Sequence, residues 1–270
     1  MSGTLHAQDR AGLELGWWEA WRRACRYEVR HLTALKSTWT LLVAMGLLSI
    51  WVPLVAAFVV RSSKDVGFQD MAASVQWSPR LAQVPTLAFY LLVFATGPVS
   101  TELLRGATRT TWLVSAGRSY AFWAKCAVGA TIGVAVAVIS ALLQCGGLAA
   151  VLAVKGIAQP AWGTLVGPVA RLALWTVCWM VLCVAVASLI RNRVVPVLVL
   201  LLIPLLAERA IEALAATIPG VDLSQLGQWL PFAAGDRMLE HGSVQHAVVF
   251  LAFTLVVSAA GHAVYGRRTG

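Results

Sequence analysis

The sequence is poor in charged residues, which excludes most soluble proteins. Only 12% of its 270 residues are Asp, Glu, Lys or Arg, whereas a soluble domain usually has roughly 25%. Hydrophobic residues make up 59% of the chain, and the mean hydropathy is +0.76. This composition predicts an integral membrane protein, and the apolar runs leave no room for a separate soluble domain.

The sequence also lacks a loop for binding nucleotide phosphates. Such a loop reads GxxxxGK[ST], and its glycines let backbone N–H groups surround the phosphates. Among the four lysines, Lys36 alone precedes a Ser or Thr, and no glycine loop stands before it. We therefore expect that this chain binds no ATP by this route and carries no cofactor of its own.

Metal-binding and disulfide patterns are missing too. The five cysteines form no CxxC pair, and no His stands at metal-ligand spacing from them. Small buried hydrophobic side chains are the expected role of these cysteines, and we expect no metal site.

Basic residues outnumber acidic ones by 21 to 12, but their placement argues for a lipid bilayer and against nucleic acid. They flank apolar runs, with 14 on one side of the expected membrane topology and seven on the other. The positive-inside rule then places both termini in the cytoplasm of a multi-pass plasma-membrane protein.

Apolar runs predict an all-α protein with six transmembrane helices. The fifth run has only 14 uncharged residues and reaches about 21 Å, short of a hydrocarbon core of roughly 30 Å. The expected spans are 39–60, 81–100, 126–154, 172–190, 194–207 and 245–264.

An amphipathic helix is expected before the first span, over 14–35. Tryptophans recur on one side of it and arginines on the other, a pattern typical of a helix lying in the headgroup region. We therefore divide the chain into a cytoplasmic N-terminal segment (1–37), a single transmembrane domain (38–265) and a cytoplasmic tail (266–270).

The stretch 102–125 is a basic interruption between the second and third spans. Glu102 is its one acidic residue. Residues 108–115 predict a short amphipathic helix on the membrane surface, and Gly117 stands where a left-handed cap would end it.

This stretch resembles the segment after the second span of ABC-2 type transporter permeases, in which a Glu precedes a Gly-Thr-x-Arg-x-Thr string, an Arg and an Ala-Lys pair. Ala107 departs from the family's usual Thr, and 115–117 departs from its common Pro. The matching positions are Glu102, Gly106, Ala107, Arg109, Thr110, Thr111, Leu113, Arg118, Ala124 and Lys125.

The resemblance implies an exporter permease whose coupling helix docks on a separate cytoplasmic ATPase subunit, where ATP and Mg are bound. It also implies a second permease copy, an N-terminal connecting helix, and re-entrant outer helices within 208–244, with Leu230 and Pro231 near their junction. The expected docking residues are Arg105, Arg109, Trp112 and Arg118.

Candidates for a substrate path lie inside the spans. Trp175 and Trp179 are one helical turn apart near mid-membrane, where they would either line a cavity for an apolar or amphiphilic substrate or form a packed helix contact. Gln144 and Glu208 are weaker candidates for the same path.

Two other functions stay open. An intramembrane enzyme would need a Gly-x-Ser nucleophile with a His in a later span, or paired Glu with His; His262 is available, but no Gly-x-Ser lies within an expected span. Glu208 and Glu212 beside Arg209 are more typical of a solvated turn, so we assign no catalytic residue. A membrane anchor or immunity protein is the third reading.

Overall fold

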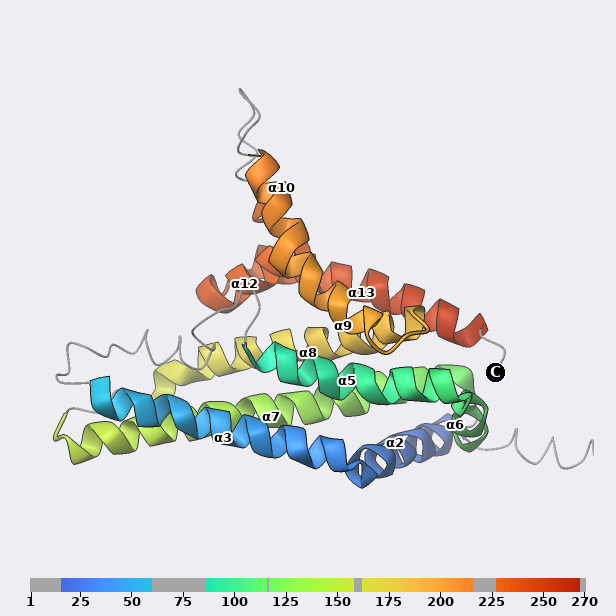
Figure 1. Cartoon of the computed structure of the whole chain (residues 1–270), viewed down its shortest axis with the longest axis horizontal. Coiled ribbons are helices and arrows are strands. Elements are labelled where there is room, and N and C mark those ends of the chain that lie inside the picture. Colours follow the sequence, from blue (N-terminus) through green and yellow to red (C-terminus); the bar gives the residue numbers. More distant parts are fainter. Residues whose placement is uncertain (1–15, 60–85, 116, 158–161, 216–226, 268–270) are drawn as a thin grey trace, which may run out of the picture.

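A computed structural model describes residues 16–59, 86–115, 117–157, 162–215 and 227–267, and all regular secondary structure within them is helical (Figure 1). The main helices are α2 (Trp17–Ala34), α3 (Lys36–Val59), α5 (Thr86–Arg105), α6 (Thr108–Val114), α7 (Arg118–Val154), α8 (Val166–Leu189), α9 (Val195–Leu202), α10 (Glu208–Ala215), α12 (Pro231–His241) and α13 (Val244–Arg267).

Four of these helices, α5, α7, α8 and α13, are each long and apolar enough to cross a membrane. The bent pair α2 and α3 passes the same test only when both helices are taken together, with a bend of 73° between them. The protein is therefore a helical membrane protein. Residues 81–85 of the expected second span, and the features expected at 216–226, lie outside the described residues.

The third span begins earlier than the sequence indicated. Helix α7 starts at Arg118 and continues for 37 residues to Val154, whereas the apolar run begins at Cys126. The first two turns of α7 carry polar and aromatic side chains, so apolar periodicity alone does not reveal them. This earlier start brings Ser119 and Lys125 onto the helix.

Helix α8 lies at the centre of the bundle and packs against α5, α7 and α13 (Figure 1). Two glycines allow the close approach of its neighbours. A Cβ on Gly133 of α7 would come within 2.7 Å of Met180, and one on Gly261 of α13 within 2.9 Å of the Ala185 backbone. Gly133 stands four residues after Gly129 on α7, a spacing that permits close helix packing.

The fifth apolar run forms a bent rod that leaves the bundle (Figure 1). Its 13-residue apolar part, Val195–Ala207, contains a π-helical turn at Ile203–Ala207. Pro204 lies in that turn and has no N–H for the helical ladder, which explains a local break. The rod continues as α10, and α12 follows before α13.

Candidate functional site

One end of the bundle gathers α2, α6 and the C-terminal end of α13 (Figure 1). Helix α6 joins α5 to α7 there, close to the position predicted for a short helix. Gly106, with φ of 68°, ends α5 in the left-handed conformation. Gly117 precedes α7 with φ of 148°, so it adopts another glycine-favoured conformation in place of the predicted left-handed cap.

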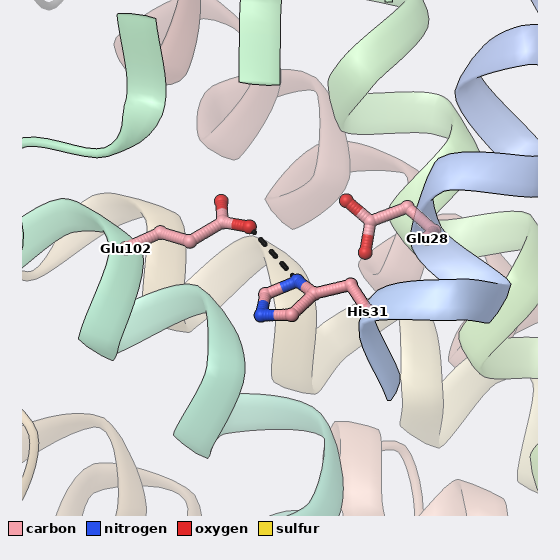
Figure 2. A group of neighbouring side chains, drawn as sticks. All are labelled: Glu28, His31 and Glu102. Atoms are coloured by element: carbon pink, nitrogen blue, oxygen red, sulfur yellow. Dashed lines mark ion pairs between the residues drawn. The ribbon is translucent and has the colours of Figure 1, made fainter. Parts of the chain in front are cut away.

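Beneath α6, four ionisable side chains from three helices meet in the protein interior. Lys125 of α7 donates hydrogen bonds to Glu28 of α2 and, over 2.9 Å, to Glu102 of α5. His31 Nδ1 lies 3.2 Å from the same Glu102 oxygen. Figure 2 shows His31 and Glu102 joined in this way, with the Glu28 carboxylate turned toward the same space. We call these four residues the charge cluster.

Burial makes these contacts consequential. The side chains of Lys125, Glu28 and Glu102 are only 3%, 4% and 6% exposed. A buried charge is tolerated when it is paired and hydrogen-bonded, and each carboxylate here meets the ammonium. The charge cluster therefore locks α2 to the two helices that flank α6.

The charge cluster has the donors of a metal site, but its chemistry favours an internal cation. Donor atoms of Glu28, His31 and Glu102 lie within 4.8 Å of one another, and two carboxylates with an imidazole suit a divalent metal. The Lys125 ammonium already bonds to both carboxylates. It supplies the positive charge that a metal would bring, so a metal would have to displace it.

His31 is the member of the charge cluster that can exchange a proton near neutral pH. Its hydrogen bond to Glu102 raises its pKa above the ordinary 6.5. A cavity of about 290 Å³ between α3 and α5 reaches His31, and the side chain is 26% exposed. With His31 neutral the charge cluster carries one net negative charge, and protonation of His31 neutralises it.

The expected docking residues differ in their surroundings. Arg105 is exposed, and the side chain of Arg109 lies outside the described residues. Trp112 packs edge-on against Tyr265 at 6.0 Å. Arg118 lies 4.5 Å over the Trp112 ring and donates to the carbonyl of Gly266 over 2.5 Å. Trp112 and Arg118 thus join α6 to the end of α13.

Leu113 is the apolar residue that α6 presents outward. It is 83% exposed, more than any other large hydrophobic residue described on α6. In the sequence it matched the family pattern, but it was not singled out for docking.

Three of the four candidates for the substrate path, Trp175, Trp179 and Glu208, pack around Phe232, whose ring lies 5.9 Å from that of Trp179. Trp175 and Trp179 are fully buried and stacked at 5.1 Å, and Trp179 donates to the carbonyl of Ala88 over 3.0 Å. This is the packed helix contact that the sequence left open beside the lining of a cavity. Glu208 accepts hydrogen bonds from Phe232 N–H and Ala233 N–H, both at 2.9 Å.

Gln144 is the remaining candidate, and its amide is the least satisfied. The side chain is 1% exposed, and neither its oxygen nor its nitrogen has a hydrogen-bond partner within the described residues. A buried, unpaired amide is costly. Gln144 therefore stays a candidate for contact with a polar group of a ligand.

Sequence reasoning missed Glu28 and His31. Its amphipathic reading of α2 followed tryptophans and arginines, but the buried face of that helix consists of Ala20, Ala24, Glu28 and Leu32. These residues recur every four positions and so share one face of the helix. Ala20 and Ala24 on that face indicate close packing against another helix. An acid within such a stripe requires a buried cation.

Known proteins offer no closer identification: no model of a protein family matches this sequence, and the search of curated proteins found no relative.

Proposed function

We propose that the chain is the transmembrane permease subunit of an ATP-driven ABC exporter, powered by a separate cytoplasmic ATPase. The observation that carries the proposal is the family-like stretch from Glu102 to Lys125, whose middle forms the short helix α6 with Thr110 and Leu113 exposed. Two permease copies would form the translocation path. Each copy has six spans if α2 lies in the headgroup region of the membrane and α9 to α10 form the fifth span.

The charge cluster supports a mechanical role for α6. Glu102 precedes α6 by one turn of α5, and Lys125 lies in the second turn of α7. Because both residues bond within the same buried group, force applied to α6 would reach α2, α5 and α7 together. Such coupling shifts the permease between two arrangements of its spans only if ATP binds the complex more tightly in one arrangement than in the other.

Docking is tested by replacing an exposed apolar residue of α6 and a basic residue just before it with acidic ones. The double variant Leu113→Asp with Arg105→Glu should lose the ATPase in a mild-detergent pull-down of the tagged chain, while membrane insertion stays intact. Leu113 suits this test better than Trp112, because Trp112 packs against Tyr265 inside the protein.

Val154→Asp is the matched control. Val154 is an 89% exposed apolar residue at the opposite end of α7, so an added charge there leaves α6 untouched. The proposal requires a co-purifying subunit with GxxxxGK[ST] from wild type and from this control. Retention of that subunit by the α6 double variant, or its absence from wild type, would overturn the proposal.

A further inference from the structure

A serine and a histidine from distant parts of the chain meet beside an apolar groove. Ser119 Oγ lies 3.0 Å from His262 Nε2, which joins the first turn of α7 to α13. Ser119 follows Gly117 and Arg118, so a Gly-x-Ser sequence stands at the start of a membrane helix. The sequence had placed these residues in a loop, outside any span.

The imidazole is held from two further sides. The ring of Phe122 lies 5.4 Å from that of His262, and the ring of Trp123 lies 5.8 Å away. These contacts orient Nε2 toward Ser119. In the tautomer with the proton on Nδ1, Nε2 accepts the Ser119 hydrogen and can act as a general base.

Backbone donors stand next to the hydroxyl. The first backbone hydrogen bond of α7 runs from Ala121 N–H to the Gly117 carbonyl over 3.2 Å. The N–H groups of Ser119 and Tyr120 precede it and are not used by the helical ladder. A pair of such donors beside a nucleophile is what stabilises the oxyanion of an acyl-transfer intermediate.

Ser119 also lines an apolar groove of about 470 Å³. The groove follows α7 from Ser119 to Ala130, eleven residues or about 16 Å at 1.5 Å per residue. That is roughly half of a 30 Å hydrocarbon core, the depth of one lipid leaflet. The other lining residues are Trp21, Tyr120, Trp123, Cys126, Ala127, Val177 and Val181.

We propose that Ser119 and His262 form a nucleophile–base pair that hydrolyses a carboxylic ester of a fatty-acyl amphiphile. The acyl chain lies in the groove, and the ester carbonyl meets Ser119 at its polar end. Aromatic and apolar residues along the groove suit a single acyl chain, and the hydroxyl stands where the chain would end in its ester.

The reaction balances without an oxidant or a metal. Ser119 Oγ bonds to the ester carbon while its proton passes to His262 Nε2. The carbon–oxygen bond to the alcohol breaks, and His262 gives the proton to the leaving oxygen. Water then attacks the acyl-serine with His262 as base, releasing the fatty acid and restoring Ser119.

The test uses the full-length chain in nanodiscs with a fluorescent alkyl fluorophosphonate, which labels activated serines covalently. Wild type should be labelled, Ser119→Ala should not, and His262→Gln should label about 10²–10⁴-fold more slowly. Hydrolysis of a decanoyl ester should fall in the same two variants. Wild type should hydrolyse the decanoyl ester faster than an acetyl ester, because only the longer chain fills the groove.

The chain offers matched controls. Ser243 bonds to His246 over 2.7 Å but does not line the groove, so Ser243→Ala should label like wild type. Ala130→Phe fills the inner end of the groove and should reduce both decanoyl hydrolysis and labelling by the alkyl fluorophosphonate, whose chain needs the same groove. Ile139→Phe, on an exposed position of the same helix, should change neither.

Equal labelling of wild type and Ser119→Ala, or labelling that survives His262→Gln unchanged, would overturn the proposal and leave the pair as a helix–helix contact. Single-peak gel filtration of each variant excludes misfolding as the cause. Neither measurement uses an ATPase, so its outcome is independent of the pull-down that tests the permease.

Discussion

Replacing Lys125 by Met tests the charge cluster most directly. The ammonium bonds to two carboxylates whose side chains are at most 6% exposed. Removing it leaves Glu28 and Glu102 buried together, with protonated His31 as the one cation left in the charge cluster. Loss of one partner of a buried ion pair costs about 3–5 kcal/mol, and two facing carboxylates put Lys125→Met at the upper end of that range.

Substitutions of the other members of the charge cluster should cost less stability than Lys125→Met. Glu28→Gln leaves Lys125 bonded to Glu102, so the expected cost is about 1.5–3 kcal/mol, that of one charged hydrogen bond. The triple variant Lys125→Met with Glu28→Gln and Glu102→Gln removes every charge except that of His31. Because no uncompensated carboxylate remains, it should be more stable than Lys125→Met alone.

Equilibrium unfolding in mixed SDS micelles measures these free energies. Lys155→Met is the control, since Lys155 is an exposed lysine near the other end of α7 and should change stability by less than about 0.5 kcal/mol. The reasoning would be refuted if Lys125→Met matched this control, or if the triple variant were no more stable than Lys125→Met.

Three further predictions follow from single contacts. Gly261→Ala should cost about 1–3 kcal/mol, because its Cβ meets the Ala185 backbone; Gly266→Ala, with no atom within 4 Å, should leave the melting temperature unchanged. The raised pKa of His31 means that its contribution to stability is full below pH 6.5 and is lost as pH rises through the raised value. Wild type should thus lose stability in thermal unfolding as the pH rises above 6.5, and the slope should flatten in His31→Gln; equal slopes would contradict this. Glu208→Ala should speed amide exchange at Phe232 and Ala233 and destabilise by about 0.5–2 kcal/mol, whereas unchanged exchange would show that α12 does not depend on this carboxylate.

The membrane helices could largely be predicted because apolar length is a local property. The fourth and sixth runs coincide closely with α8 and α13. The beginning of α7 could not be predicted in this way, since the side chains of its first two turns are polar or aromatic. Hydropathy reports contact with lipid, and these turns contact α2, α6 and α13 instead.

The charge cluster illustrates a different limit. Glu102 and Lys125 belong to one short stretch that the sequence had singled out, but their pairing appears only in the structure. Glu28 and His31 come from a helix about 70 residues earlier, and only the packing of Ala20 and Ala24 brings them close. The spacing of residues along the sequence predicts which face of a helix is buried. It does not predict which other helix packs against that face, because that depends on the tertiary structure.

The two proposals rest on opposite sides of the same helix start. Lys125 ties the second turn of α7 to α2 and α5, while Ser119 and Arg118 tie its first turn to α13. A force on α6 would therefore act on His262 as well as on the charge cluster. If both proposals hold, a bound ATPase should alter the fluorophosphonate labelling rate of Ser119, and Lys125→Met should weaken that effect more than Lys155→Met. A labelling rate that does not change when the ATPase binds would show that α6 and the Ser119–His262 pair are not coupled. It would leave each of the two proposals to its own test.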